Sequence, residues 1–159
     1  GTAIDKSNLA AAINQVMNLL VVGTLDTFGN ACTGSAGTPD LALSGIPDTG
    51  GSISIDHSNL ASQQAAILAI GTSKTNWAGN PLPLPLDNFG LQGCTLFISL
   101  DVGLPFSTGS GSASVPINIL ENPAFVGITL YFQTIALDPG APTSANAIAT
   151  NAGELFIGG

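Results

Sequence analysis

Positive charge is almost absent from this chain of 159 residues. Lys6 and Lys74 are the only cationic side chains besides one histidine, and ten carboxylates give a formal net charge of −8. Nucleic acids and anionic lipid surfaces are bound through clusters of lysine and arginine. The composition therefore excludes nucleic acid as a partner. No run of 18 apolar residues occurs either, so we expect no insertion into a membrane.

Charged residues of both signs make up only 8% of the chain, where about 25% is typical of globular domains. Twenty glycines, ten prolines and many small polar residues take their place. These residues favour turns and interrupt long helices. The composition predicts an all-β protein built from many short strands around one core.

Short apolar runs between turn residues indicate where the strands lie. Turn chemistry is clearest at Thr49-Gly50-Gly51 and Asp138-Pro139-Gly140. Together with a strand expected within 18–28, the runs predict an antiparallel β-sandwich or jelly roll of about seven or eight strands. The runs are Leu41–Leu43, Ser52–Asp56, Ala65–Gly71, Cys94–Val102, Ser112–Leu120, Phe125–Leu137 and Ala147–Ile157. Residues 78–91 are rich in proline, and we expect them to form an extended loop or edge across the sandwich.

The first 27 residues differ from the rest and are assigned to an N-terminal apolar arm, with the sandwich domain at 28–159. Apolar residues recur at helical spacing, which favours a short helix over 6–17. Alternation from Ile13 onward also fits a strand that could be donated to another sheet. The apolar residues of the arm are Leu9, Ile13, Val16, Met17, Leu20, Val21 and Val22.

The two cysteines, Cys32 and Cys94, fit a disulfide in an oxidising compartment. Such a bridge would close a loop of about 60 residues and contribute about 4 kcal/mol in the chain-entropy model. Two buried free thiols are the alternative. We expect an extracellular or cell-surface location, with any export signal removed before Gly1.

The sequence gives little support for a catalytic site. Asp56-His57-Ser58 contains the residue types of a triad, but neighbouring residues on a strand point to opposite faces, so the three side chains cannot act together. We expect His57, the only histidine, to be a solvated turn residue. One histidine and two paired cysteines leave no ligand set for zinc. Calcium remains open through loop carboxylates, without an EF-hand spacing. We expect no enzyme activity and no cofactor.

Trp77 is the only tryptophan and lies close to two asparagines, Asn76 and Asn80. An aromatic ring beside amides can stack against a sugar, so these three residues form a candidate glycan site. Anchoring a loop to the core is the alternative role for Trp77.

The order of motifs from about Phe28 to Gly158 resembles a C-terminal module of unknown function from large secreted proteins of planctomycete-type bacteria. Phe28, Ala31 and Ala78 depart from the tyrosine and glycines that are usual there. The resemblance implies secretion and a disulfide-linked sandwich, and it implies no catalytic residue. The motifs are Phe28-Gly29 before Cys32, Gly71-Thr72-Ser73 before Trp77 and Gly79, Pro81-Leu82-Pro83-Leu84, Gly93-Cys94, Leu104-Pro105, Asn122-Pro123, Val126-Gly127, Leu130-Tyr131-Phe132-Gln133, Leu137-Asp138-Pro139-Gly140 and Ser144-Ala145-Asn146.

The shortage of charge bears on function because charged side chains normally prevent strand edges from pairing with other chains. An apolar arm outside the sandwich could add to a neighbouring copy, as in donor-strand complementation. A head-to-tail contact of this kind builds an open filament. We therefore predict a structural subunit of a filament or surface layer whose partner is another copy of itself. The alternatives are an arm that completes its own sandwich and a monomeric glycan-binding or adhesion module centred on Trp77.

Overall fold

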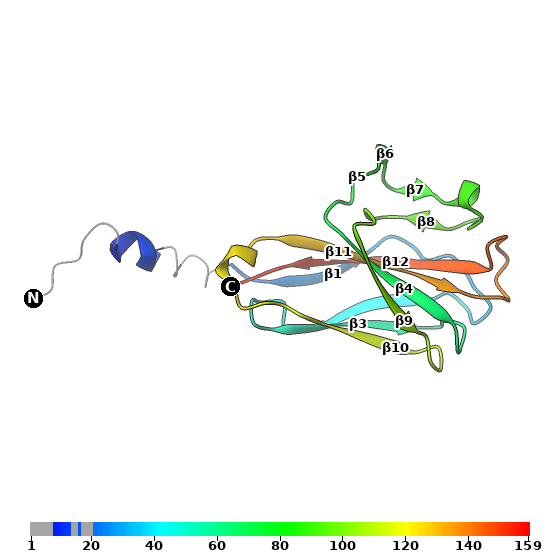
Figure 1. Ribbon diagram of the computed structural model, residues 1–159, viewed down its shortest axis with the longest axis horizontal. Coiled ribbons are helices and arrows are strands. Elements are labelled where there is room, and N and C mark those ends of the chain that lie inside the picture. Colours follow the sequence, from blue (N-terminus) through cyan, green and yellow to red (C-terminus); the bar gives the residue numbers. More distant parts are fainter. Residues whose placement is uncertain (1–7, 14–15, 17–20) are drawn as a thin grey trace, which may run out of the picture.

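The computed structural model describes residues 8–13, 16 and 21–159. Two antiparallel sheets pack face to face and form a β-sandwich, which confirms the predicted fold class (Figure 1). Eight strands of five or more residues build it. The five-stranded sheet has the order β1 (Thr24–Phe28), β12 (Ala147–Phe156), β11 (Thr129–Leu137), β4 (Ala65–Gly71) and β9 (Val102–Ser107). The three-stranded sheet has the order β10 (Ala113–Asn118), β3 (Ser52–Ser58) and β2 (Asp40–Gly45).

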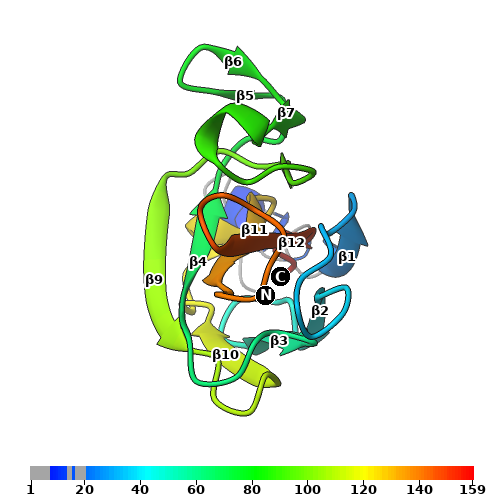
Figure 2. The same ribbon diagram turned by 90° about the vertical axis from the view of Figure 1, so that its right-hand side faces the viewer.

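A third layer lies on the outer face of the five-stranded sheet, as the view along the strands in Figure 2 shows. It is formed by the chain between β4 and β9, residues 72–101, which we call the cover segment. This segment contains two short ribbons and a single turn of 3-10 helix. They are β5 (Asn76–Trp77) with β6 (Asn80–Pro81), β7 (Leu84–Pro85) with β8 (Thr95–Leu96), and η1 (Asp87–Phe89). A second 3-10 turn, η2 (Pro123–Phe125), precedes β11.

The predicted strand over Cys94–Val102 is wrong in its extent. Only Thr95–Leu96 pair there as a strand, and the next strand begins at Val102. The backbone between them is bonded elsewhere, because the Phe97 N–H donates to the Gln133 side chain and the Ser99 N–H donates to the Ser73 carbonyl. An apolar run therefore became an irregular buried segment of the cover.

Burial on one face or on two explains the apolar patterns of the strands. In β3, Ile53, Ile55 and His57 are buried and alternate with more exposed serine and aspartate, because one face of the three-stranded sheet meets water. In β12, seven of ten residues are buried and the other three are partly buried, since the cover lies on one side and the second sheet on the other. The central core includes Leu41, Leu68, Phe132 and Leu155.

The outer strands of the two sheets are protected without lysine. Pro105 lies in β9 and Pro116 lies in β10, which are edge strands on the same side of the sandwich. Proline has no N–H to offer to an added strand. On the opposite side, the Asn151 side chain accepts from the Leu41 N–H at 2.8 Å and donates to the Leu41 carbonyl at 2.9 Å, which occupies part of the β2 edge.

Residues 8–13 form a helix, which agrees with the helical reading of that part of the arm (Figure 1). Met17 and Leu20 lie outside the described residues. Val21 joins the body of the protein because its carbonyl accepts from the Gly159 N–H. Residues 24–27, which the sequence assigned to the arm, lie in β1 and pair with β12. Among the described residues, no helix has the length and apolarity needed to cross a membrane.

Candidate functional site

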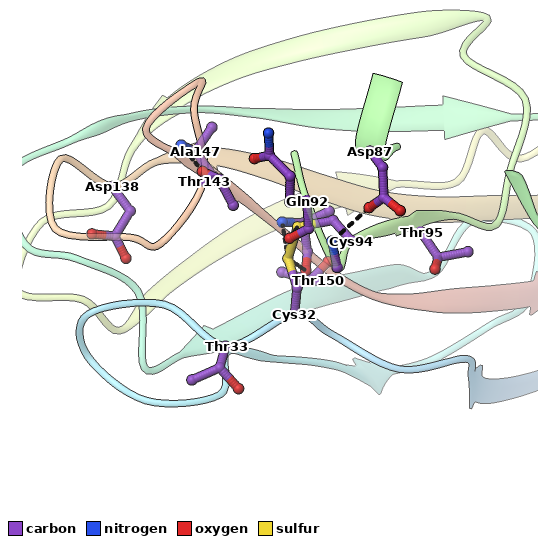
Figure 3. Close-up of a disulfide and its surroundings, with 12 residues drawn as sticks. Cys32, Thr33, Asp87, Gln92, Cys94, Thr95, Asp138, Thr143, Ala147 and Thr150 are labelled. Atoms are coloured by element: carbon purple, nitrogen blue, oxygen red, sulfur yellow. Dashed lines mark hydrogen bonds between the residues drawn. A yellow bond between two sulfur atoms is a disulfide. The ribbon is translucent and has the colours of Figure 1, made fainter. Parts of the chain in front are cut away.

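The Cys32–Cys94 disulfide fastens the cover segment to the sheet (Figure 3). Both cysteines are buried. Cys32 lies against β12, where its N–H donates to the Ala149 carbonyl and its Sγ accepts from the Ala149 N–H. Cys94 directly precedes β8 in the cover. The predicted disulfide is therefore present, and it joins the chain after β1 to the outer layer.

Gln133 makes a second connection between the cover and the sheet. This side chain is fully buried. Its Oε1 accepts from the Phe97 N–H at 2.9 Å, and its Nε2 donates to the carbonyls of Thr95 and Thr150 at 2.8 Å. Sequence reasoning missed this residue. The available signal was an uncharged amide within the apolar run from Leu130 to Ala136.

The prediction that His57 is a solvated turn residue is wrong. His57 lies in β3 and is only 4% exposed. Its ring packs on Phe106, and its two nitrogens lie near the Thr134 hydroxyl and the Ala113 carbonyl. Burial lowers the pKa of His57 below its usual value. A turn was expected because Asp, His and Ser are polar, but the pleat of β3 places His57 on the inner face with Ile53 and Ile55.

Asp56 points away from His57, onto the outer face of the three-stranded sheet. Its carboxylate accepts hydrogen bonds from the hydroxyls of Ser54, Ser114 and Ser44. These bonds, led by that of Ser54, lower the pKa of Asp56. The two side chains of the apparent triad therefore lie on opposite faces of one strand, as the alternation of a strand requires.

The candidate glycan residues come together in one ribbon. Trp77 pairs with Asn80 across the turn between β5 and β6, and Asn76 precedes Trp77 on β5. Asn76 and Asn80 are exposed, whereas Trp77 is partly buried and packs against the core cluster that contains the disulfide. The indole thus serves as an anchor for the cover segment.

The apolar residues of the N-terminal helix are exposed. Leu9 is 51% exposed, Ile13 48% and Val16 56%. Their spacing of four and three residues places them on one face of a helix. Val22, next to the body of the protein, is also exposed. The described arm therefore presents an apolar stripe, Leu9, Ile13 and Val16, to solvent.

A shallow apolar groove lies on the outer face of the five-stranded sheet beside the cover segment. Two adjoining hollows of about 250 and 230 Å³ share Ile67 and Ile135. Ile67, Val102 and Leu137 are each about half exposed there. We call this surface the outer groove. Its residues are Ala65, Ala66, Ile67, Ala69, Leu100, Asp101, Val102, Gly103, Ile135 and Leu137.

Asp101 is the one charged residue that lines the outer groove. Its carboxylate accepts from the Ser99 hydroxyl and from both the N–H and the hydroxyl of Thr72. These hydrogen bonds, that of Ser99 first, lower the pKa of Asp101. Asp101, the last residue of the cover segment, is therefore hydrogen-bonded to Thr72, its first residue. The remaining residues that line the groove carry no ionisable group.

A second apolar hollow, the end pocket, opens between the two sheets. Its volume is about 210 Å³. It lies where β10 ends and β11 begins, close to the C-terminal residues. Its lining residues are Ile117, Asn118, Ile119, Leu120, Phe125, Leu130, Leu155 and Ile157.

No family model matches the chain, and no curated protein matches it either. Among residues 8–13, 16 and 21–159, no group of three or more histidine, cysteine, aspartate or glutamate side chains is arranged to hold a metal ion. The candidate functional surfaces are thus the apolar stripe, the outer groove, the end pocket and the Trp77 ribbon.

Proposed function

We propose that this protein is a non-enzymatic, extracellular structural subunit that assembles with copies of itself through its N-terminal arm. The observation that carries the proposal is the exposed stripe of Leu9, Ile13 and Val16. Burying a large aliphatic side chain completely contributes about 1.5–3 kcal/mol. Since these three are about half exposed, their burial by a neighbour would contribute a few kcal/mol for each arm.

The contact is proposed to be helical where the arm is described. Residues 8–13 are helical, and a helix that lays an apolar face into a groove is a common mode of recognition. The strand form of the contact is less well supported at these positions. The product is proposed to be a filament or surface layer.

An extracellular location is supported by the disulfide, because such bonds persist in oxidising compartments. The resemblance to secreted planctomycete-type modules points in the same direction. A surface with very few lysines also agrees with a protein whose contacts are apolar.

The test is self-association of the full chain and of arm variants, measured by analytical ultracentrifugation and electron microscopy. Deletion of residues 1–20 and the substitution Ile13→Asp are expected to abolish assembly. Ala11→Asp is the matched control, because it adds the same charge on the opposite face of the same helix. Assembly of Ile13→Asp at the concentration required by the intact chain would contradict the proposal.

A second candidate function is glycan binding by Trp77, Asn76 and Asn80, favoured by their arrangement on one ribbon in which both asparagines are exposed. Because Trp77 also anchors the cover, Trp77→Ala would disturb the fold as well as the site. A glycan array with the intact chain and with Asn80→Ala, which alters an exposed side chain, separates the two effects. Binding that is absent from the intact chain excludes this function.

A further inference from the structure

The outer groove and the apolar stripe have matching dimensions. Leu9 and Val16 are seven residues apart in the sequence, and a helix that carries two residues at this spacing separates them by about 10 Å. Ala65 and Ala69 on β4 bound the groove over four residues, or about 13 Å along a strand. Anchors at i, i+4 and i+7 are the pattern by which amphipathic helices fill apolar grooves. The stripe therefore has the length and chemistry of a ligand for this groove.

The distance between the root of the arm and the groove follows from the strand register. Thr24 and Thr129 both pair with Phe156, so they mark one end of the sheet. Ile67 pairs with Ile135, six residues further along β11, and Val21 lies three residues before Thr24. Nine residues correspond to about 30 Å along the strands. β1 and β4 are three strand spacings apart, which adds about 14 Å sideways.

In the same molecule, Val16 lies too close to the root of the arm to cover this distance. Val21 is fixed at the body by its hydrogen bond to Gly159. The five residues from Val21 back to Val16 span at most about 17 Å when fully extended. The separation of Val21 and Ile67 is about 33 Å, from the two components above. Val16 therefore cannot enter the centre of the outer groove of its own chain.

The end pocket is different, because the arm of the same chain can reach it. Leu130 lies one residue beyond Thr129 and two strands from β1. Its distance from Val21 is about 17 Å, which equals the reach of Val16. An arm that folds back on its own molecule would thus cover the end pocket. Placing the whole stripe in the outer groove requires the arm of another molecule.

We infer that the outer groove receives the apolar stripe of a second copy of this chain, an inference that rests on the proposed function. The arm leaves one end of the sandwich, and the centre of the groove lies well along the sheet from that end. The apolar stripe is the donor surface and the outer groove is the acceptor surface, and each molecule carries both. Such a heterologous contact repeats from copy to copy and gives an open filament when the rotation does not close a ring.

The experiment uses full-length variants that each lack one half of the contact. Ile13→Asp removes the donor, and Ile67→Asp removes the acceptor at a side chain that is half exposed. Each variant alone is expected to need at least a tenfold higher concentration to assemble. Their equimolar mixture is expected to stop at a dimer, because the intact arm of one fills the intact groove of the other. Sedimentation velocity distinguishes monomer, dimer and filament.

Leu137→Asp serves as a second acceptor variant if Ile67→Asp fails to fold, since Leu137 is exposed at the end of β11. Leu120→Asp is the control, because it places the same charge at an exposed position of the end pocket. It is expected to assemble like the intact chain. If both folded acceptor variants assemble normally while Ile13→Asp does not, the groove inference is wrong and the arm docks elsewhere. If Ile13→Asp also assembles normally, the proposed function itself fails.

Discussion

The Nε2 atom of His57 lies 2.7 Å from the Oγ1 atom of Thr134 inside the sandwich. The Nδ1 atom lies 3.1 Å from the Ala113 carbonyl, which can only accept. This geometry assigns the proton of a neutral ring to Nδ1, so Nε2 accepts from the Thr134 hydroxyl. The pair joins β3 of one sheet to β11 of the other by a polar contact within the core.

The pH dependence of stability should reveal the buried His57. Because burial lowers its pKa in the folded state, the unfolded chain binds this proton more readily between the lowered pKa and about 6.5. The free energy of unfolding is therefore complete above about pH 6.5 and decreases as the pH falls through that window. Urea unfolding at several pH values checks this, and the dependence should vanish in His57→Gln.

The same group gives a direct spectroscopic test. His57 is the only histidine, so one imidazole resonance reports its titration in the folded protein. We expect a midpoint below 6.5. A midpoint at or above this value would mean that the ring is not buried as described.

Thr134→Val should destabilise the fold although it preserves the shape of the side chain. The substitution leaves the buried Nε2 of His57 without a donor, and an unsatisfied buried polar group costs about 1–3 kcal/mol. Thr134→Ser is the control because it keeps the hydroxyl. Equal urea midpoints for Thr134→Val and the parent chain would show that the hydrogen bond contributes nothing.

Gln133→Leu should release the cover segment from the sheet. The change orphans the Phe97 N–H and the carbonyls of Thr95 and Thr150, at a total cost of several kcal/mol. Hydrogen exchange at the Phe97 amide should accelerate more than exchange in β3. Gln92→Leu is the matched control, because Gln92 is exposed and its side chain is hydrogen-bonded to Ser144. This change should alter stability by less than about 1 kcal/mol.

Reduction of the disulfide should lower the free energy of unfolding by about 4 kcal/mol, since the two cysteines are 62 residues apart. The effect arises mainly from the greater freedom of the unfolded chain. Urea unfolding with and without reductant measures it, and the Cys32→Ser, Cys94→Ser double variant should match the reduced protein. A reduced protein as stable as the oxidised one would contradict the assignment.

The edge prolines should limit nonspecific strand pairing. Pro116→Thr and Pro105→Thr restore an N–H on an edge strand, so we expect faster formation of thioflavin-positive aggregates. Pro142→Thr, in the exposed loop between β11 and β12, is the control. Unchanged aggregation in both edge variants would show that the edges are protected by other means.

Local sequence patterns predicted much of the architecture because strands alternate or run apolar according to the faces they bury. Ala65–Gly71 was predicted with its observed bounds, and the helical spacing of Leu9 and Ile13 agrees with the helix at 8–13. From the shortage of charge, the sequence favoured strand edges that are open to pairing with other chains. It did not indicate that Pro105 and Pro116 lie on those edges, because strand order is set by distant pairings.

Gln133 and His57 show most clearly what only the tertiary structure decided. Both are buried polar residues within strands, and their hydrogen-bond partners lie 17 to 77 residues away. The sequence by itself determined an all-β chain, the single pair of cysteines available for a bridge, and an apolar arm. The tertiary structure decided which polar groups are satisfied in the core and which apolar side chains remain exposed in the outer groove. Burial depends on the neighbours that the fold brings together. These neighbours cannot be identified from the adjacent residues of the chain.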